Sequence, residues 1–229
     1  MNVGERMGLM TILPSVNPAD ADSGVLAGTY ISLKNHQRCT VVVSLGAMSA
    51  GTTTIRLMQA QNVAAAGAKA LNFTHVWRMG CKVFHDAPVG TFQVGEVVTG
   101  VGISGTTGII HELHGSFMIV YEIAVATFVV GDVLTGTTSG ATANATTVAL
   151  EYGLNCRVPL AAAAATVVLT IPDETYEIEV DPADLDINNG FDCMVAQVSA
   201  SGGANLVGIN YLLSKPRYKE QPQKSAYQD

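Results

Sequence analysis

The feature that most constrains this 229-residue chain is a stretch of nine residues that occurs twice. FQVGEVVTG begins at Phe92 and FVVGDVLTG begins at Phe128, which is 128 − 92 = 36 positions later. Each copy leads into a polar turn, Ser104-Gly105 in the first and Ser139-Gly140 in the second. A single hairpin buries little surface, so two copies packed together make a better core. The repeat therefore predicts an inserted small β-barrel or hairpin module over residues 88–150, with Phe92 and Phe128 as equivalent core residues.

Composition favours β structure in the rest of the chain as well. Hydrophobic residues make up 48% and charged residues 14%, which supports a buried core. There are 23 glycines and many Thr, Val and Ala residues, a balance typical of strands joined by tight turns. We therefore expect a mainly β protein.

The segments on both sides of the repeat alternate between apolar and polar residues, as half-buried strands do. A polar turn over 35–38 separates the first two, and the small residues over 60–67 leave a short helix open. Together the segments predict a β-sandwich body of jelly-roll type, formed by residues 25–87 and 151–229 and interrupted by the module. The predicted strands are 30–34, 39–45, 52–59, 73–78, 166–171 and 206–213, and two further strands lie around a compact polar turn within residues 175–203.

Residues 1–24 have the composition of an extended N-terminal arm. Pro14 and Pro18 lie among small polar residues, which prevents a regular helix. Several apolar residues precede or adjoin Pro14, and an isolated monomer has little reason to expose them. Two interpretations stay open, an arm that binds a partner and a first core strand over residues 9–13. The apolar residues are Met7, Leu9, Met10, Ile12 and Leu13.

The overall charge argues against nucleic acid as a partner. Twelve basic and 19 acidic residues give a formal charge of −7, which repels a phosphate backbone. The chain begins without an apolar run of signal-peptide length, and the apolar stretch over 158–171 is too short and too interrupted to cross a bilayer. We expect a soluble protein that is synthesised in the cytoplasm and has no membrane partner.

Charges of opposite sign gather in two separate segments. Eight acidic residues lie between Asp173 and Asp192, and four basic residues lie between Lys215 and Lys224. This polarity would suit head-to-tail contact between copies. Two independently solvated segments would show the same pattern.

The HELH sequence resembles a metal-binding pair at first sight. His111 and His114 are three positions apart, whereas the zincin helix needs two histidines four apart. On a strand, this spacing predicts side chains on opposite faces. We interpret both histidines as surface polar residues.

A second motif, DPADLDINNG, resembles a calcium loop in part. Asp184, Asp186 and Asn188 alternate as oxygen ligands do, but the sixth position lacks glycine and the twelfth lacks glutamate. A turn of helix accounts for the same residues, with Asp181 as N-cap and Pro182 at the first helical position. We predict no metal site, and cation binding at the three alternating residues stays an open alternative.

No group of residues suggests catalysis or a cofactor. GTTSGAT lacks the G-x-S-x-G form of a nucleophile elbow, and GVGISG lacks the helix that a dinucleotide site needs directly after its glycines. His36, His75 and His85 have no carboxylate or cysteine at a recognisable spacing. We predict a protein that is not an enzyme and carries no cofactor.

The four cysteines, Cys39, Cys81, Cys156 and Cys193, form no C-x-x-C pair. Cys81 and Cys156 flank the module, so they come near each other if its ends meet. Because the cytoplasm keeps thiols reduced, we expect four thiols and no disulfide between residues 81 and 156.

Two groups of segments outside the module carry a family resemblance. They are GTYISLKNHQRCTVVVSLG with AGTTTIRLMQA, and TYEIEVDPADLDINNGFDCMVAQVSAS with NYLLSKPRY, and they cover most of residues 25–72 and 166–219. These segments resemble virion structural proteins of tailed bacteriophages, of the capsid decoration or cement type. The repeated F-x-x-G-E/D-x-x-T-G unit is similar to a small β repeat grafted into phage virion proteins of several kinds.

The resemblance implies a β-sandwich on the capsid surface, usually a homotrimer, that binds the major capsid protein and stabilises the capsid. An extended arm would reach neighbouring subunits, so Met7, Leu9, Met10, Ile12 and Leu13 become candidate capsid contacts. Three alternatives stay open: a tail- or fibre-associated virion protein, a host-surface module whose barrel binds carbohydrate, and an enzyme with a dispersed site.

Overall fold

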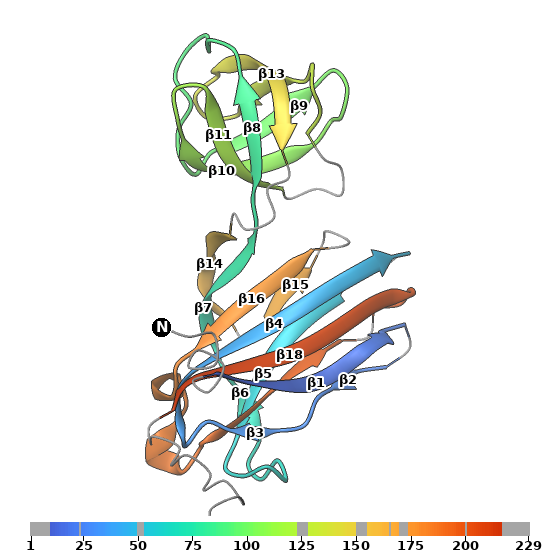
Figure 1. Ribbon diagram of the computed structural model, residues 1–229, viewed down its shortest axis with the longest axis vertical. Coiled ribbons are helices and arrows are strands. Elements are labelled where there is room, and N and C mark those ends of the chain that lie inside the picture. Colours follow the sequence, from blue (N-terminus) through green and yellow to red (C-terminus); the bar gives the residue numbers. More distant parts are fainter. Residues whose placement is uncertain are drawn as a thin grey trace, which may run out of the picture.

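Two bodies are visible in the computed structural model, a β-sandwich and a closed barrel at one end of the long axis (Figure 1). The predicted fold class, a mainly β sandwich with an inserted small barrel, is confirmed. The structure describes residues 10–22, 24–49, 53–122, 128–149, 155–164, 166–169, 174–199 and 201–216.

The sandwich consists of two antiparallel sheets. Sheet A has the order β1-β18-β4-β16-β7-β14, and sheet B has the order β15-β5-β17-β2, with β3 paired to β17 and β6 paired to β5. Sheet A contains β1 (Met10–Asp20), β4 (His36–Met48), β7 (Phe73–Met79), β14 (Asn155–Ala164), β16 (Thr175–Val180) and β18 (Asn205–Pro216). Sheet B contains β2 (Leu26–Ala27), β3 (Ile31–Ser32), β5 (Thr53–Ala60), β6 (Lys69–Ala70), β15 (Thr166–Leu169) and β17 (Cys193–Val198).

The core lies between the two sheets, where strands such as β4 and β16 bury every second side chain. In β4, Val41 and Val43 are fully buried, whereas Val42 between them is only partly buried. These residues join one apolar cluster with Ile55 and Leu57 from sheet B. Burial of one such side chain contributes about 1.5–3 kcal/mol, so the alternating pattern is the main source of sandwich stability.

Tyr211 connects the two sheets through a hydrogen bond inside this core. Its hydroxyl oxygen accepts the backbone N–H of Ala196 in β17 at 2.8 Å. The Ser15 hydroxyl of β1 donates to the same oxygen at 2.9 Å. The tyrosine is fully buried, so these bonds satisfy a polar group that would otherwise be costly to bury.

Residues 10–20 do not form a separate arm but the edge strand β1 of sheet A. Antiparallel pairing with β18 runs from Met10 opposite Ser214 to Asp20 opposite Leu206, with register shifts around Val16. The prediction of an arm over residues 1–24 is therefore wrong for this part, and the alternative of a first strand holds. Prolines are tolerated at a sheet edge, so they did not exclude a strand. Residues 1–9 lie outside the described residues.

Two further segments differ from the expectation. The small residues over 60–67 form turns, in which the Asn62 side chain accepts the backbone N–H groups of Ala64 and Ala66. In the region of the alanine run, a strand was expected only from residue 166 onward. The structure has an additional strand there, β14, which ends at Ala164 and pairs with β7. Pairing with a neighbouring strand outweighs the weak strand propensity of alanine.

The barrel closes in the order β10-β11-β8-β13-β12-β9. Phe92 and Phe128 are 5% and 1% exposed and belong to one barrel core, as the repeat predicted. The strands are β8 (Cys81–His85), β9 (Val97–Val101), β10 (Thr107–Leu113), β11 (Phe117–Glu122), β12 (Val133–Gly136) and β13 (Thr142–Ala149).

The module begins earlier than predicted, at β8 rather than at residue 88. β8 pairs with β11 and with β13, so the barrel cannot close without it. The alternation of β7 continues across Gly80 into β8, and for this reason the sequence pattern did not mark the change of body. At the junction, Lys82 is opposite Ala149 and Met79 is opposite Asn155. The ends of the module therefore lie side by side, as expected for an insertion.

We predict that the sandwich folds without the barrel. Replacement of residues 81–149 by a short Gly/Ser linker should leave a β protein with one cooperative transition, because the paired ends need only a short connection. Calorimetry of the full chain should show an additional transition from the barrel. A shortened chain without β signal in circular dichroism would contradict two independent bodies.

Candidate functional site

The two sequence copies face each other across an approximate local two-fold axis in the barrel. β9 from the first copy pairs antiparallel with β12 from the second, and Thr99 lies directly opposite its repeat equivalent Thr135. The acidic residue of each copy, Glu96 or Asp132, is buried at 5% and 0% exposure. Two buried carboxylates in a small barrel need a specific structural reason.

Each carboxylate binds the polar turn of the other copy. Glu96 accepts the backbone N–H groups of Thr138 and Ser139 at 3.1 and 2.9 Å, and the Ser139 hydroxyl at 2.8 Å. Asp132 accepts the Ser104 backbone N–H at 2.9 Å and also the Ser104 hydroxyl. The duplicated acid and the duplicated serine are thus reciprocal partners, and they lock the two copies together.

The glycine that ends the T-G step of each copy, Gly100 or Gly136, leaves room for these carboxylates. A Cβ atom added to Gly100 would lie 2.7 Å from Asp132 Oδ2, and one added to Gly136 would lie 2.7 Å from Glu96 Oε1. Both distances are shorter than a carbon and an oxygen tolerate, so any side chain would displace the carboxylate. This accounts for glycine at the same position of both copies.

The hydrogen bonds also set the charge state of the two carboxyl groups. Burial alone would raise the pKa of Glu96, but hydrogen bonds from Ser139 and Gln93 outweigh it and leave the pKa below its ordinary value. Burial likewise favours a higher pKa for Asp132, but hydrogen bonds from Ser104 and Val129 outweigh it and leave this pKa below its ordinary value as well. Both groups therefore stay ionised as acceptors, which is what the surrounding N–H and O–H donors require.

We predict that Glu96→Gln destabilises the barrel by about 1–3 kcal/mol at neutral pH, because the amide presents a donor to groups that already donate. The native stabilisation is complete above the unfolded-state pKa of about 4.5 and is lost as pH falls through the lower folded value. Denaturant unfolding across this acid range should show a flatter pH dependence for Glu96→Gln than for the native chain. Glu112→Gln, at an exposed barrel carboxylate, is the control, and equal behaviour of the two variants would contradict the role of Glu96.

The neck between the bodies contains a buried ion pair. Arg78 of β7 is 9% exposed, and its Nε and Nη2 donate to the two carboxylate oxygens of Glu174 at 3.1 and 2.8 Å. The guanidinium also lies 5.3 Å from the ring centre of Tyr176 and 5.7 Å from that of Tyr121. Tyr121 belongs to the barrel, so this one arginine contacts both bodies. The sequence offered no signal for this pair, because 96 positions separate its members.

We predict that Arg78→Met destabilises the protein by about 3–5 kcal/mol, since it leaves Glu174 charged and buried without its cation. Arg38→Met, which breaks an ion pair to Glu179 with side chains 45% and 35% exposed, should cost about 0–1 kcal/mol. Adding Glu174→Gln to Arg78→Met should recover part of the loss. Equal unfolding midpoints for the two single variants would contradict this role of Arg78.

The predicted capsid contacts are only partly placed by the structure. Ile12 lies on β1 with 58% of its surface exposed, whereas Leu13 next to it packs against the sandwich core. The backbone of Met10 pairs with Ser214. Met7 and Leu9 fall outside the described residues. Of the five residues, Ile12 is thus the one whose side chain is shown to be exposed.

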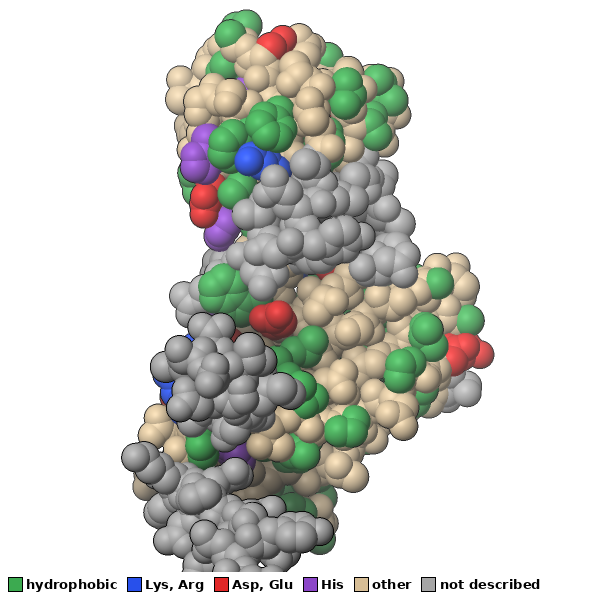
Figure 2. All heavy atoms as spheres, viewed as in Figure 1, with side chains coloured by type: hydrophobic (Ala, Val, Ile, Leu, Met, Phe, Trp, Pro, Cys, Tyr) green, Lys and Arg blue, Asp and Glu red, His purple; other side chains and the backbone are tan. Residues whose placement is uncertain are grey.

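The two histidines of HELH do not lie on opposite faces. A β-bulge at His111 shifts the register between Ile110 and Glu112. As a result, both imidazoles approach the Glu112 carboxylate, His114 Nε2 at 3.3 Å and His111 Nε2 at 3.9 Å. Histidine and acidic side chains accordingly gather on the barrel near the sandwich (Figure 2). A one-residue bulge cannot be recognised from the spacing of the two histidines, so the prediction of opposite faces was wrong.

The DPADLDINNG segment has the predicted capped turn. It forms the 3-10 helices η1 (Pro182–Asp184) and η2 (Ile187–Asn189). The Asp181 side chain accepts the Ala183 N–H at 2.8 Å, and Asp184 accepts the Asp181 N–H at 2.8 Å. The N-cap interpretation is confirmed, and both carboxylates already have a structural role.

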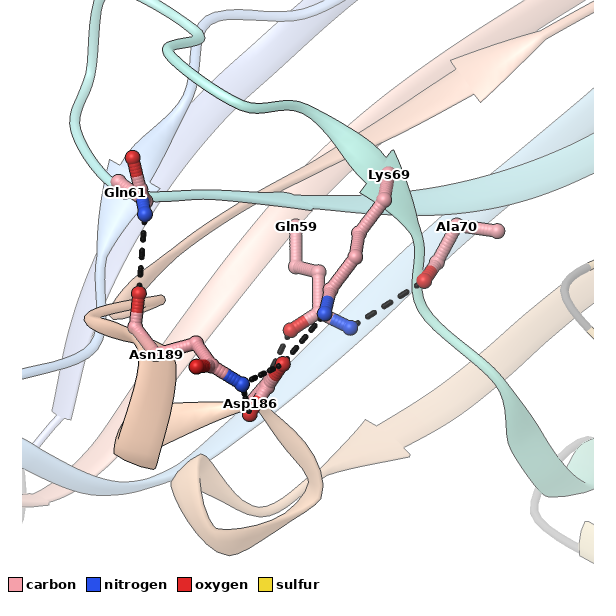
Figure 3. A network of polar contacts seen from close by, with 6 residues as sticks. All are labelled: Gln59, Gln61, Lys69, Ala70, Asp186 and Asn189. Carbon is pink, nitrogen blue, oxygen red and sulfur yellow. Dashed lines mark hydrogen bonds and ion pairs between the residues drawn. The ribbon is translucent and has the colours of Figure 1, made fainter.

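Asp186 connects this segment to sheet B instead of pointing to an ion site (Figure 3). Its carboxylate binds the Lys69 ammonium group and accepts both hydrogen bonds from Asn189 Nδ2, at 2.9 and 2.8 Å. Its backbone N–H donates to Gln59 Oε1 at 2.8 Å. A lysine cation thus binds the Asp186 carboxylate, which the calcium interpretation assigned to a metal. Within the described residues, no group of three His, Cys, Asp or Glu side chains is arranged to hold a metal ion.

All four cysteines are buried and outside any disulfide in the structure. Cys81 belongs to the barrel core and Cys156 to the cluster at the neck, so flanking the module does not bring them into one cluster. Burial raises the pKa of Cys39 to about 12 and that of Cys156 to about 11. Both thiols are therefore protonated and unreactive at neutral pH.

A polar groove lies over the outer face of sheet A, with a cavity volume of about 230 Å³. Its described lining combines aromatic rings with one arginine and three carboxylates. The charged residues that line it are Arg38, Glu179, Asp181 and Asp184, and the lining residues of β7 are Phe73, Thr74, His75 and Trp77. Sequence analysis did not single out this set, because it comes from three strands and a turn far apart in the chain.

Comparisons with protein-family models, with curated proteins and with solved structures found no match to this chain. Among the residues that the structure describes, no helix is long and apolar enough to cross a membrane.

Proposed function

We propose that this chain is a non-enzymatic structural protein of a tailed-phage virion, which decorates the capsid surface, bridges capsid subunits and stabilises the shell. Its partners are the major capsid protein and further copies of itself in a homotrimer. The sequence resemblance of residues 25–72 and 166–219 supports this proposal, and both segments contribute strands to the sandwich. Nucleic acid is not a partner in the proposal, because the chain carries a net charge of −7.

The observation that carries the proposal is the outer edge of β1. In the described part of the chain, β1 hydrogen-bonds to β18 on one side and is the last strand of sheet A on the other. Such an edge presents backbone N–H and C=O groups to which a strand of another protein can add. Ile12 is 58% exposed on this strand, an apolar anchor of the kind that an added strand covers.

The same edge discourages pairing with arbitrary strands. Pro14 and Pro18 lack an N–H group, and register shifts interrupt β1 around Val16. These features disfavour open-ended aggregation through regular strands. They favour a specific partner whose shape matches the irregular edge. A capsid lattice, which offers the same surface many times, is a partner of this kind.

We predict that Ile12→Lys lowers occupancy of the protein on capsids by about tenfold or more while changing its unfolding free energy by less than about 0.5 kcal/mol. The reason is that Ile12 is exposed in the isolated protein and becomes buried only on docking. Occupancy is measured by cosedimentation with empty capsids, and unfolding by denaturant titration. Val63→Lys is the control, at a valine 63% exposed in a turn of sheet B.

Removal of residues 1–9 tests the remaining apolar residues without disturbing β1. We expect a folded protein with weakened capsid binding, because Met7 and Leu9 are lost while the β1–β18 pairing is kept. Unchanged occupancy of both variants would reject this edge as the capsid contact. Absence of the native protein from purified virions, examined by electron microscopy and mass spectrometry, would reject the proposed function itself.

A further inference from the structure

The step from Asn189 to Gly190 is the one Asn-Gly pair in the sequence. An asparagine followed by glycine loses its side-chain amide more readily than other asparagines, because glycine has no side chain to shield its backbone nitrogen. The fold nevertheless needs glycine here, since Gly190 ends η2 in the left-handed conformation with φ of 81°. Asn189 is exposed, so water reaches this step. The turn therefore contains a chemically labile peptide step for a structural reason.

Deamidation at this step needs no reactant other than water. The Gly190 backbone nitrogen loses its proton to the solvent and attacks Cγ of Asn189, so that an N–Cγ bond forms. The Cγ–Nδ2 bond then breaks, and the side-chain nitrogen takes up a proton and leaves as ammonia. Water opens the resulting cyclic imide at either carbonyl and gives aspartate or isoaspartate. The product carries a negative charge where the native chain has a neutral amide.

Two sets of hydrogen bonds in the folded chain oppose this attack. Asn189 Nδ2 donates to both carboxylate oxygens of Asp186, at 2.9 and 2.8 Å (Figure 3). The Gly190 N–H donates to the Ile187 carbonyl oxygen at 2.9 Å. The bond from Gly190 has to break before its nitrogen can attack, and the bonds to Asp186 fix the amide group that has to turn toward that nitrogen.

Asp186 is itself held in place by sheet B. Its carboxylate binds the Lys69 ammonium group, and its backbone N–H donates to Gln59 Oε1 at 2.8 Å. Hydrogen bonds from Lys69 and Asn189 lower the pKa of Asp186, so the carboxylate is an ionised acceptor at neutral pH. The group that restrains Asn189 is thus anchored by one residue of β5 and one of β6.

Deamidation converts the donor in this contact into an acceptor. A carboxylate at position 189 would face the Asp186 carboxylate without a proton to share, and the two charges repel each other. The same turn anchors both ends of the loop 61–69, because Gln61 Nε2 donates to the Asn189 carbonyl oxygen at 2.9 Å and Lys69 binds Asp186. Loss of the amide therefore weakens the attachment of this loop.

We propose that Asn189 is a site of spontaneous deamidation, that Asp186 keeps it unreacted in the folded chain, and that the reaction permanently releases the loop 61–69 from η2. The rate depends on how often η2 opens, because the attack requires both sets of hydrogen bonds to break. The change is one-way, since ammonia is lost to the solvent. It is a property of the isolated chain and does not depend on capsid binding.

Peptide mapping by mass spectrometry measures the reaction directly. The purified chain and the synthetic peptide LDINNGFD, residues 185–192, are incubated at mildly alkaline pH. We expect the folded chain to deamidate at Asn189 at least about tenfold more slowly than the peptide. Asp186→Ala should speed the reaction of the folded chain at least about threefold. Asp192→Ala, at a carboxylate that accepts the Cys193 thiol instead of the Asn189 amide, is the control and should keep the native rate.

Peptides with either substitution should react like the parent peptide, which separates the effect of the fold from that of the local sequence. If circular dichroism shows that Asp186→Ala is not folded, Lys69→Met takes its place, because it keeps the carboxylate and removes the cation that holds it. The same acceleration is expected. A folded variant that reacts at the native rate, or a native chain that reacts as fast as the peptide, would overturn the proposal.

Hydrogen exchange tests the release of the loop. Asn189→Asp copies one product of the reaction, and Asn188→Asp adds the same charge at the neighbouring exposed asparagine. The first variant should raise exchange at least about threefold at the hydrogen-bonded amides of Gln61, Ala65 and Ala68, and the second should leave it unchanged. Equal exchange in the two variants would refute the release of the loop.

Discussion

The structure depends on a topological constraint, the return of the chain to the sandwich after it has built a closed barrel. A closed barrel has no edge that could pair with a neighbouring sheet. The two bodies are therefore joined by two strand pairs that continue each other, Lys82 opposite Ala149 on the barrel side and Met79 opposite Asn155 on the sandwich side. Orientation of the barrel then depends on side chains at the neck. Arg78 performs this role, since it binds Glu174 within the sandwich and contacts the Tyr121 ring of the barrel.

Within the barrel, duplication solves a problem that one copy cannot solve. A turn with exposed N–H groups needs an acceptor, and a buried carboxylate needs donors. Glu96 and the Ser139 turn satisfy each other, and so do Asp132 and the Ser104 turn. Because the acid of each copy binds the turn of the other copy, neither copy is complete alone. This exchange also explains the glycine of each T-G step, where the carboxylate of the other copy passes close to the backbone.

The two bodies present different surfaces. The barrel is closed and leaves no strand edge, whereas sheet A of the sandwich ends in β1 and carries the groove around Trp77 on its outer face. In the proposed capsid protein, contact with the shell takes place at the β1 edge, and the barrel stands at the far end of the long axis from most of that sheet (Figure 1). Groups that first suggested metal chemistry have structural roles instead. Asp184 completes a capping box, and Asp186 binds Lys69.

The sequence by itself determined the elements that depend on neighbours in the chain. The alternation predicted most sandwich strands, the repeat predicted the inserted module and its two core phenylalanines, and the Asp181-Pro182 pair predicted the capped turn, because periodicity, duplication and capping are local properties. Tertiary structure alone decided the rest. Residues 10–20 became a strand because β18 lies beside them, β14 formed from a segment with an alanine run because β7 lies beside it, and the bulge at His111 turned two histidines toward one carboxylate. Arg78 and Glu174, and the lining of the Trp77 groove, come from strands far apart in the chain. These residues come close together only because of the strand order, and strand order is a property of the whole sheet.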